Sequence, residues 1–177
     1  MNLRRDVGVE ERNRTDQGNK AWEAPVAGDI FVDAEGDWFY QGNKIIREDI
    51  LAFFCDHLEC TADNAYSVVW EDQRCALMVD DTPFVITRVE RAASREGGRD
   101  LFMLAIKHVS PPEILDPESL WVGKDNVLYG RVRSGRFPAR FSRPAYYQMA
   151  EWIQEDPVTG EFFLEINDER CPVRFRE

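Results

Sequence analysis

Alternating apolar and polar residues mark most of the chain from residue 29 onward, and this alternation predicts strands with one buried face. Helical spacing appears between residues 47 and 58, where Ile50, Leu51, Phe54 and Leu58 would lie on one side. The first half is therefore predicted to contain one helix among hairpins. Its predicted strands cover residues 29–33, 37–41, 66–70, 74–79, 84–91 and 101–109.

The second half shows the same kind of pattern. A helix is predicted from residue 143 to about 155, because Ser142 suits the N-cap position and Pro144 is tolerated in the first turn. The predicted strands cover residues 120–122, 127–133, 136–141, 161–166 and 171–175. A proline-dense stretch at residues 110–117 is the natural connector between the halves.

An internal repeat links the halves. Arg47 and Arg143 each begin a predicted helix and are 96 residues apart, and Cys75 and Cys171 in later strands are also 96 residues apart. We therefore predict an α+β fold of two repeated β-hairpin–helix–β-hairpin units, with mostly antiparallel sheets each packed against a helix. Chance similarity between hairpins is the alternative. The predicted units are 22–110 and 111–177, preceded by a disordered or loosely packed arm at 1–21.

Composition narrows the class of protein. A chain of 177 residues with 44% hydrophobic residues can bury a core of ordinary size. No apolar run approaches the roughly 18 residues of a transmembrane helix, and the polar start does not resemble a signal peptide, so a cytoplasmic location without a membrane partner is expected. The net charge of −11 argues against nucleic acid as a partner.

The four cysteines are expected to be free buried thiols, because the chain shows no export signal. Cys55, His57 and Cys60 have the residue types of a zinc site. On a helix, however, Cys55 and His57 would lie about 200° apart and could not share one ion. The sequence therefore predicts no metal site and no cofactor.

Several motifs resemble those of the bacterial family called domain of unknown function 1285. They lie at residues 28–30, 36–42, 79–85, 127–135 and 143–147, and the aromatic Trp38-Phe39-Tyr40 and the segment Asp81-Thr82-Pro83-Phe84 are the most specific. The resemblance covers residues 22 to the end. It implies a two-part α+β fold with repeated structural motifs and a role in ligand binding or signal transduction. That family has no established reaction, so the resemblance supplies no catalytic residues.

Five arginines between residues 131 and 143 form the most unusual charge feature, because no acidic residue interrupts them. Arg131 and Arg133 are two residues apart, so on a strand they would share a face and could bind a phosphate or carboxylate. Ion pairing with the protein's own acids is the simpler alternative. The five residues are Arg131, Arg133, Arg136, Arg140 and Arg143.

Two further groups are candidates for ligand binding. Trp38 and Tyr40 share one strand face beside Gly36 and could line a groove, although packing against the first helix is the simpler explanation. Asp81 could act as a polar ligand-binding group, or it could accept hydrogen bonds from backbone N–H groups at the end of a strand. The predicted ligand-binding set is Trp38, Tyr40, Asp81, Arg131 and Arg133.

Two classes of function fit these observations. The first is a non-enzymatic regulatory module that binds a small anionic ligand or a partner protein, and oligomerisation is compatible with it. The second is an enzyme of unknown reaction with its site in the cleft between the halves, where Asp81 and the arginines would have polar roles. A cleft holding a strongly perturbed carboxylate, cysteine or histidine would favour the enzyme.

Overall fold

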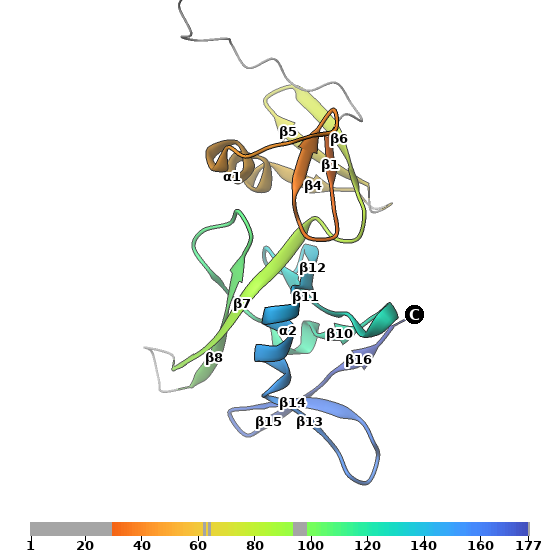
Figure 1. The fold of residues 1–177 in the computed structure, drawn as a ribbon. Helices are drawn as coiled ribbons and strands as arrows, with labels where there is room; N and C mark the ends of the chain where they lie inside the picture. The colour runs from red at the N-terminus through yellow and green to blue at the C-terminus, as the bar shows by residue number, and fades with distance from the viewer. Residues whose placement is uncertain (1–29, 62, 64, 94–98, 177) are drawn as a thin grey trace, which may run out of the picture.

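The computed structural model describes residues 30–61, 63, 65–93 and 99–176. Within them the chain forms an α+β fold that is mostly strand: a six-stranded sheet, a seven-stranded sheet, a three-stranded sheet and two short helices. Figure 1 shows the six-stranded sheet with the first helix at one end and the three-stranded sheet at the other. The predicted arm at 1–21 and the first motif residues, 28 and 29, lie outside the described residues.

The six-stranded sheet has the order β3-β2-β1-β6-β5-β4. The predicted first hairpin is present: β1 pairs antiparallel with β2, and Gly36 in the turn has a φ of 74°, which suits a residue without a Cβ. β1 also pairs parallel with β6, so the sheet is mixed. The strands are β1 (Ile30–Val32), β2 (Trp38–Tyr40), β3 (Asn43–Lys44), β4 (Leu58–Cys60), β5 (Tyr66–Trp70) and β6 (Gln73–Val79).

Helix α1 (Glu48–Asp56) covers this sheet. It buries Leu51, Phe54 and Cys55, and the Phe54 ring packs at 5.6 Å from the Trp38 ring of β2. The helix is shorter than predicted, because Leu58 leaves it and begins β4, where it pairs with Val68 of β5. Leu58 is buried as predicted, but from a strand.

The seven-stranded sheet has the order β16-β10-β11-β12-β7-β8-β9. Antiparallel hairpins form most of it, while β12 pairs parallel with β7 and β10 parallel with β16. Ser110-Pro111, just before β9, is a cis peptide bond. The strands are β7 (Phe84–Ala93), β8 (Asp100–Ile106), β9 (Glu113–Ile114), β10 (Trp121–Val122), β11 (Leu128–Val132), β12 (Phe137–Phe141) and β16 (Arg174–Phe175), with 3-10 helices η1 (Pro117–Ser119) and η2 (Lys124–Asn126) between them.

Helix α2 (Arg143–Ala150) follows β12 directly and packs on β7. Ser142 is its N-cap, as predicted, and the Ser142 hydroxyl accepts a hydrogen bond from the Ala145 N–H. The helix ends before the predicted residue 155, because residues 153–155 pair with the next strand instead. The three-stranded sheet that follows contains β13 (Ile153–Glu155), β14 (Phe162–Ile166) and β15 (Glu169–Pro172).

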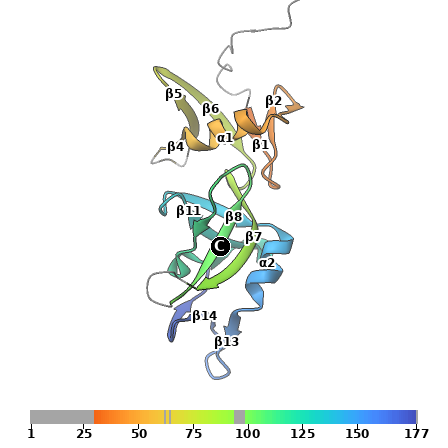
Figure 2. The same ribbon diagram turned by 90° about the vertical axis from the view of Figure 1, so that its left-hand side faces the viewer.

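One buried apolar cluster runs through both larger sheets and contains residues of both helices. Trp38, Phe54, Phe84 and Phe102 are among its largest buried side chains. The long strand β7 runs from the end of the first sheet down to the three-stranded sheet, as both views show (Figures 1 and 2). Because the two sheets share one core, the junction between them is itself packed.

Part of the order and register of the elements is compatible with the predicted repeat, which stays a prediction. Each helix is followed by an antiparallel three-stranded meander, β4–β5–β6 after α1 and β13–β14–β15 after α2. The last two strands keep the predicted offset, since Cys75 pairs with Val68 and Cys171 pairs with Leu164. The helices do not keep it, because at this offset buried Leu51 corresponds to exposed Tyr147.

The two larger sheets meet at residues 80–83, between β6 and β7. The proline-dense connector at 110–117 instead lies within the seven-stranded sheet, between β8 and β10. The division into repeat units at residues 22–110 and 111–177 therefore stays a prediction, and the two larger sheets divide at 80–83.

Candidate functional site

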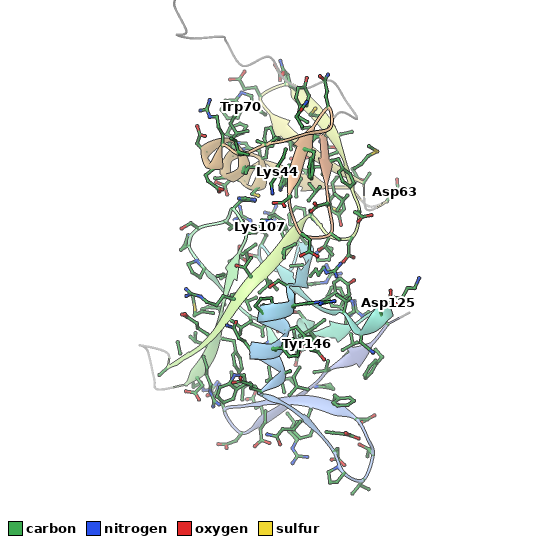
Figure 3. The ribbon with its side chains drawn as sticks, in the orientation of Figure 1. Lys44, Asp63, Trp70, Lys107, Asp125 and Tyr146 are labelled. Carbon is green, nitrogen blue, oxygen red and sulfur yellow. The ribbon has the colours of Figure 1, made fainter. Side chains whose placement is uncertain are left out.

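A groove of about 730 Å³ lies beside the first turn of α2. Its volume is within the range of small-molecule sites. One wall is the start of α2, with Arg143 and Tyr146, and another is η2 with the start of β11, including Asp125 and Asn126. Figure 3 labels Asp125 and Tyr146, one from each of these walls. The turn between β1 and β2 reaches the groove with Ala34 and Glu35, so both sheets contribute to it.

Arg140, on β12, forms an ion pair with Asp81. Its Nη1 donates to the Asp81 carboxylate at 3.1 Å, and the Tyr129 hydroxyl donates to both oxygens of the same carboxylate, at 3.0 and 3.2 Å. Burial raises the pKa of the Tyr129 hydroxyl to about 12, and the Asp81 charge adds to the shift. Tyr129 therefore stays a neutral donor, and the oxygens of the Asp81 carboxylate accept hydrogen bonds from Tyr129 and Arg140.

Packing behind this cluster fixes its geometry. The Tyr129 ring is stacked on Trp121 with centroids 5.3 Å apart, and the guanidinium of Arg176 lies 4.7 Å from the Trp121 ring. A Cβ on Gly123 would come within 2.8 Å of the Tyr129 ring. Tyr129, and through it Asp81, is therefore held rigidly.

Arg143 is the available cation of the groove. It is exposed at the first position of α2, and within the described residues it forms no ion pair. A guanidinium carries five N–H donors in a planar fork that matches a carboxylate or a phosphate. Arg143 can therefore bind an anion without breaking an internal contact.

Two carboxylates oppose this charge. Glu35 and Asp125 are exposed and also line the groove. Because both are in contact with solvent, screening weakens their effect on Arg143. The groove therefore combines two guanidinium groups with two exposed acids and the aromatic ring of Tyr146.

Arg131 and Arg133 were expected to share one face of a strand, and only Arg131 lies on it. β11 ends at Val132, and Arg133 lies in the following turn with a φ of 55°. The Arg133 guanidinium donates to Asp56 of α1 at 2.9 Å, and its backbone N–H donates to Glu113 at 2.7 Å. Arg133 therefore joins the second sheet to α1 through ion pairs, which is the simpler alternative considered above.

Arg131 lies on the exposed face of β11. Its Nη1 donates to the carbonyl of Gly135 across the turn, at 3.1 Å. Because this contact is to an uncharged carbonyl, the positive charge of Arg131 is not neutralised by it. A binding role for Arg131 stays a prediction.

The aromatic candidates lie in different environments. Trp38 is 1% exposed and packs in the core against Phe54, as the packing alternative predicted. Tyr40 is half-buried at the other end of β2 and packs against the same core. The structure therefore does not bring Trp38 and Tyr40 together with Asp81, Arg131 and Arg133 in one site.

The cysteines and His57, considered above as candidates for a zinc site, are explained by packing. Cys55, Cys60 and Cys171 are free thiols, and burial raises the pKa of the Cys55 thiol to about 12, which makes it a poor nucleophile. The His57 ring stacks on Phe53 with centroids 4.0 Å apart. Within the described residues no cluster of three His, Cys, Asp or Glu side chains could hold a metal ion, and no helix is long and apolar enough to cross a membrane.

Comparison with solved structures places the fold in a known group. A DUF1285 family protein from Silicibacter pomeroyi DSS-3 superposes with a TM-score of 0.66 and 24% identity, covering 86% of this chain and 84% of its own. A DUF1285 family protein from Shewanella baltica OS155 superposes with a TM-score of 0.58 and 20% identity, covering 70% of this chain and 91% of its own. No protein-family model and no curated protein matches the sequence.

The protein therefore has the mixed-sheet α+β fold of two bacterial DUF1285 family proteins. The resemblance expected from the motifs at residues 36–42, 79–85, 127–135 and 143–147 is confirmed at the level of the fold. DUF1285 denotes a domain of unknown function, so this likeness assigns no reaction to the protein.

Sequence reasoning missed part of this groove. Arg140 and Arg143 belong to the arginine cluster it identified, but Asn126 and Tyr146 were not singled out. Tyr146 could have been found as the residue three positions after Arg143, on the same face of a predicted helix. Asn126 lies in η2, which no periodicity predicted.

Proposed function

We propose that the protein is a non-enzymatic module that binds a small anion in the groove beside α2, with Arg143 as the main anion-binding residue. The observation that carries the proposal is the exposed Arg143 guanidinium, which forms no ion pair with another described residue, over a groove of about 730 Å³. Arg140 would assist, because Asp81 accepts from its Nη1 and other N–H donors of the guanidinium remain. The ligand would be a carboxylate or a phosphate ester of metabolite size.

We also propose a regulatory role, because residues from both larger sheets line the groove. Ala34 and Glu35 come from the first sheet, whereas α2 and η2 belong to the second half of the chain. A ligand that contacts both would favour one arrangement of the two sheets. We also propose that the two halves are copies of one hairpin–helix–meander unit, a reading supported by the shared register of the Cys75 and Cys171 strands.

The enzymatic alternative lacks a comparable observation. The described residues that line the groove include no histidine and no cysteine. Tyr129 and Asp81, which contact Arg140 or each other through hydrogen bonds, are held inside the protein, and the raised pKa of Tyr129 keeps its proton in place. We therefore favour binding over catalysis.

A thermal-shift screen tests the proposal. Acetate, succinate, inorganic phosphate and nucleotides are compared with chloride at equal ionic strength. A ligand at 100 times its dissociation constant adds about 2.7 kcal/mol of stability. For a chain of this size that corresponds to a rise in Tm of roughly 5–10 °C.

Two matched variants locate the effect. Arg143→Gln should remove the shift, whereas Arg131→Gln, on an exposed strand face outside the groove, should keep it. If Arg131→Gln removes the shift and Arg143→Gln does not, the site is at the β11–β12 turn and the proposal for the groove is wrong.

A further inference from the structure

A second, apolar pocket continues the groove along α2. It has a volume of about 370 Å³ and shares Asn126, Leu128 and Tyr146 with the larger groove. Its other walls include Ile153 and Phe162 of the three-stranded sheet. Because three residues line both spaces, the two lie next to each other along α2.

The character of the lining changes along this path. The larger groove holds Arg140, Arg143, Glu35 and Asp125, whereas none of the described residues lining the second pocket carries a charge. Phe175 of β16 is 63% exposed at this second pocket, although its ring lies 6.0 Å from that of Phe162. Apolar surface of this kind remains in contact with water until a ligand covers it.

Helix α2 gives the path its direction. Arg143, Tyr146 and Ala150 are spaced i, i+3 and i+7, so they follow one face of the helix. The axial rise from Arg143 to Ala150 is about 10 Å. The face therefore begins with a cation, continues with an aromatic ring and ends at the apolar pocket, where the small Ala150 side chain leaves room.

We propose that the ligand of this site is an amphipathic anion, with a carboxylate head bound by Arg143 and an unbranched alkyl chain lying in the apolar pocket. The inference rests on the proposed function, since it assumes that the groove binds an anion. It adds the ligand class: a free carboxylate with a chain of medium length. The Arg143 guanidinium favours an anionic head group, and the uncharged pocket beyond Tyr146 favours an alkyl chain.

Isothermal titration calorimetry with n-alkanoates measures both parts of the ligand. Butanoate, hexanoate and octanoate are titrated below the concentrations at which they aggregate, and 1-octanol serves as the uncharged control. Each buried methylene contributes about 0.8 kcal/mol, so the dissociation constant should fall about fourfold per methylene until the pocket is filled. 1-Octanol should bind more weakly than octanoate.

Two variants at the apolar end test the placement of the chain. Ala150→Phe should fill the pocket and remove the dependence of the dissociation constant on chain length. Ala76→Phe, on the exposed face of β6, is the matched control and should bind octanoate as the parent protein does. Phe175→Asp, at an exposed position, should weaken octanoate binding even if Ala150→Phe proves too unstable to purify.

The outcomes separate the two proposals. If butanoate and octanoate bind equally well, the amphipathic inference is wrong and the anion site stands. If 1-octanol binds as tightly as octanoate, and Arg143→Gln has no effect, the anion site is wrong. If the ligand-free protein forms a dimer in sedimentation velocity that octanoate does not dissociate, a second copy covers the pocket and the inference is overturned.

Discussion

Charge at the groove is set by single residues, and it can be altered without touching the core. Glu35 and Asp125 face the same space as Arg143 and are exposed to solvent. An anionic ligand would be repelled by both carboxylates while Arg143 attracts it. The affinity of the site therefore depends on two side chains that make no contribution to packing.

Neutralising these acids should strengthen anion binding. Glu35→Gln and Asp125→Asn are each expected to tighten octanoate binding by roughly twofold to fivefold, the range for single exposed charges. Calorimetry at low and high salt checks this, and high salt should remove the gain. Glu71→Gln, in the exposed β5–β6 turn, is the control; a gain of equal size there would contradict a local effect.

Thr82 supports the site from within the junction of the sheets. It is 4% exposed, its hydroxyl donates to the Phe84 carbonyl at 2.8 Å, and it accepts from the Arg140 backbone N–H at 3.1 Å. This hydroxyl fixes β12, and with it Arg140, against the start of β7.

Thr82→Val should therefore destabilise the protein by about 1–3 kcal/mol, because the buried Phe84 carbonyl loses its donor and the part-buried Arg140 N–H loses its acceptor. Urea denaturation measures the loss. Thr82→Ser, which keeps the hydroxyl, should be clearly more stable than Thr82→Val, and equal stabilities would contradict this role for the hydroxyl.

At the scale of elements, the β1–β2 turn packs directly on the second sheet. A Cβ on Gly36 would lie 2.8 Å from Cγ2 of Val85 in β7, and the φ of Gly36 is 74°. This turn carries Glu35 into the groove, so its close approach also shapes the site.

Gly36→Ala should cost about 1–3 kcal/mol, since it combines a strained backbone with overpacking against Val85. Gly42→Ala provides a matched comparison, because Gly42 has a φ of 78° but nothing within 4 Å of an added Cβ. Thermal or urea unfolding should show a larger loss for Gly36→Ala. Equal losses would mean that backbone strain alone accounts for the effect.

The elements themselves were largely predictable from the sequence. Strand β5 and the start of β7 lie where the alternation placed them, and Ser142 caps α2 as expected. The end of α2 was missed because Ile153 and Glu155 continue a helical pattern locally but pair with β14 in the fold. The two-residue strands β3 and β9 carry too few residues for a period to be read.

At the scale of the whole molecule, ion pairs connect the sheets. The Lys107 ammonium, after β8, lies 2.6 Å from Asp37 of the first hairpin, and Lys44 lies 2.6 Å from the other oxygen of that carboxylate. Figure 3 labels both lysines, which lie where the two parts of the molecule meet. Burial raises the pKa of Asp37, but the hydrogen bonds from Lys107 and Lys44 outweigh it, and the pKa is lowered.

Because the pKa of Asp37 is lower in the folded state, its ionised carboxylate stabilises the protein at pH values above 3.8, its ordinary pKa. This contribution should be lost as the pH falls below that value and through the folded pKa. Asp37→Asn should cost about 1–2 kcal/mol at neutral pH. Urea denaturation from pH 7 to 3 should show the difference between variant and parent narrowing below pH 4; a constant difference would contradict it.

The assembly of the groove could not be predicted from one sequence. Sequence alternation shows which face of a strand is buried but not its partner, and the parallel pairs β1–β6, β7–β12 and β10–β16 each join segments far apart in the chain. Those pairings bring Glu35, Asp125 and Arg143 to one place. The arginine cluster was visible in the sequence, but its division into the paired Arg133 and Arg140 and the available Arg143 depends on the tertiary structure.

The most direct test of the binding site is an NMR titration of the isotope-labelled protein with octanoate. We expect the backbone amide shifts to change most at η2, at the start of β11 and along α2, including Asn126, Tyr146 and Ala150. Residues at the β11–β12 turn, around Arg131 and Arg133, should change little. Changes concentrated at that turn, or spread evenly over the protein, would contradict a binding site in the α2 groove.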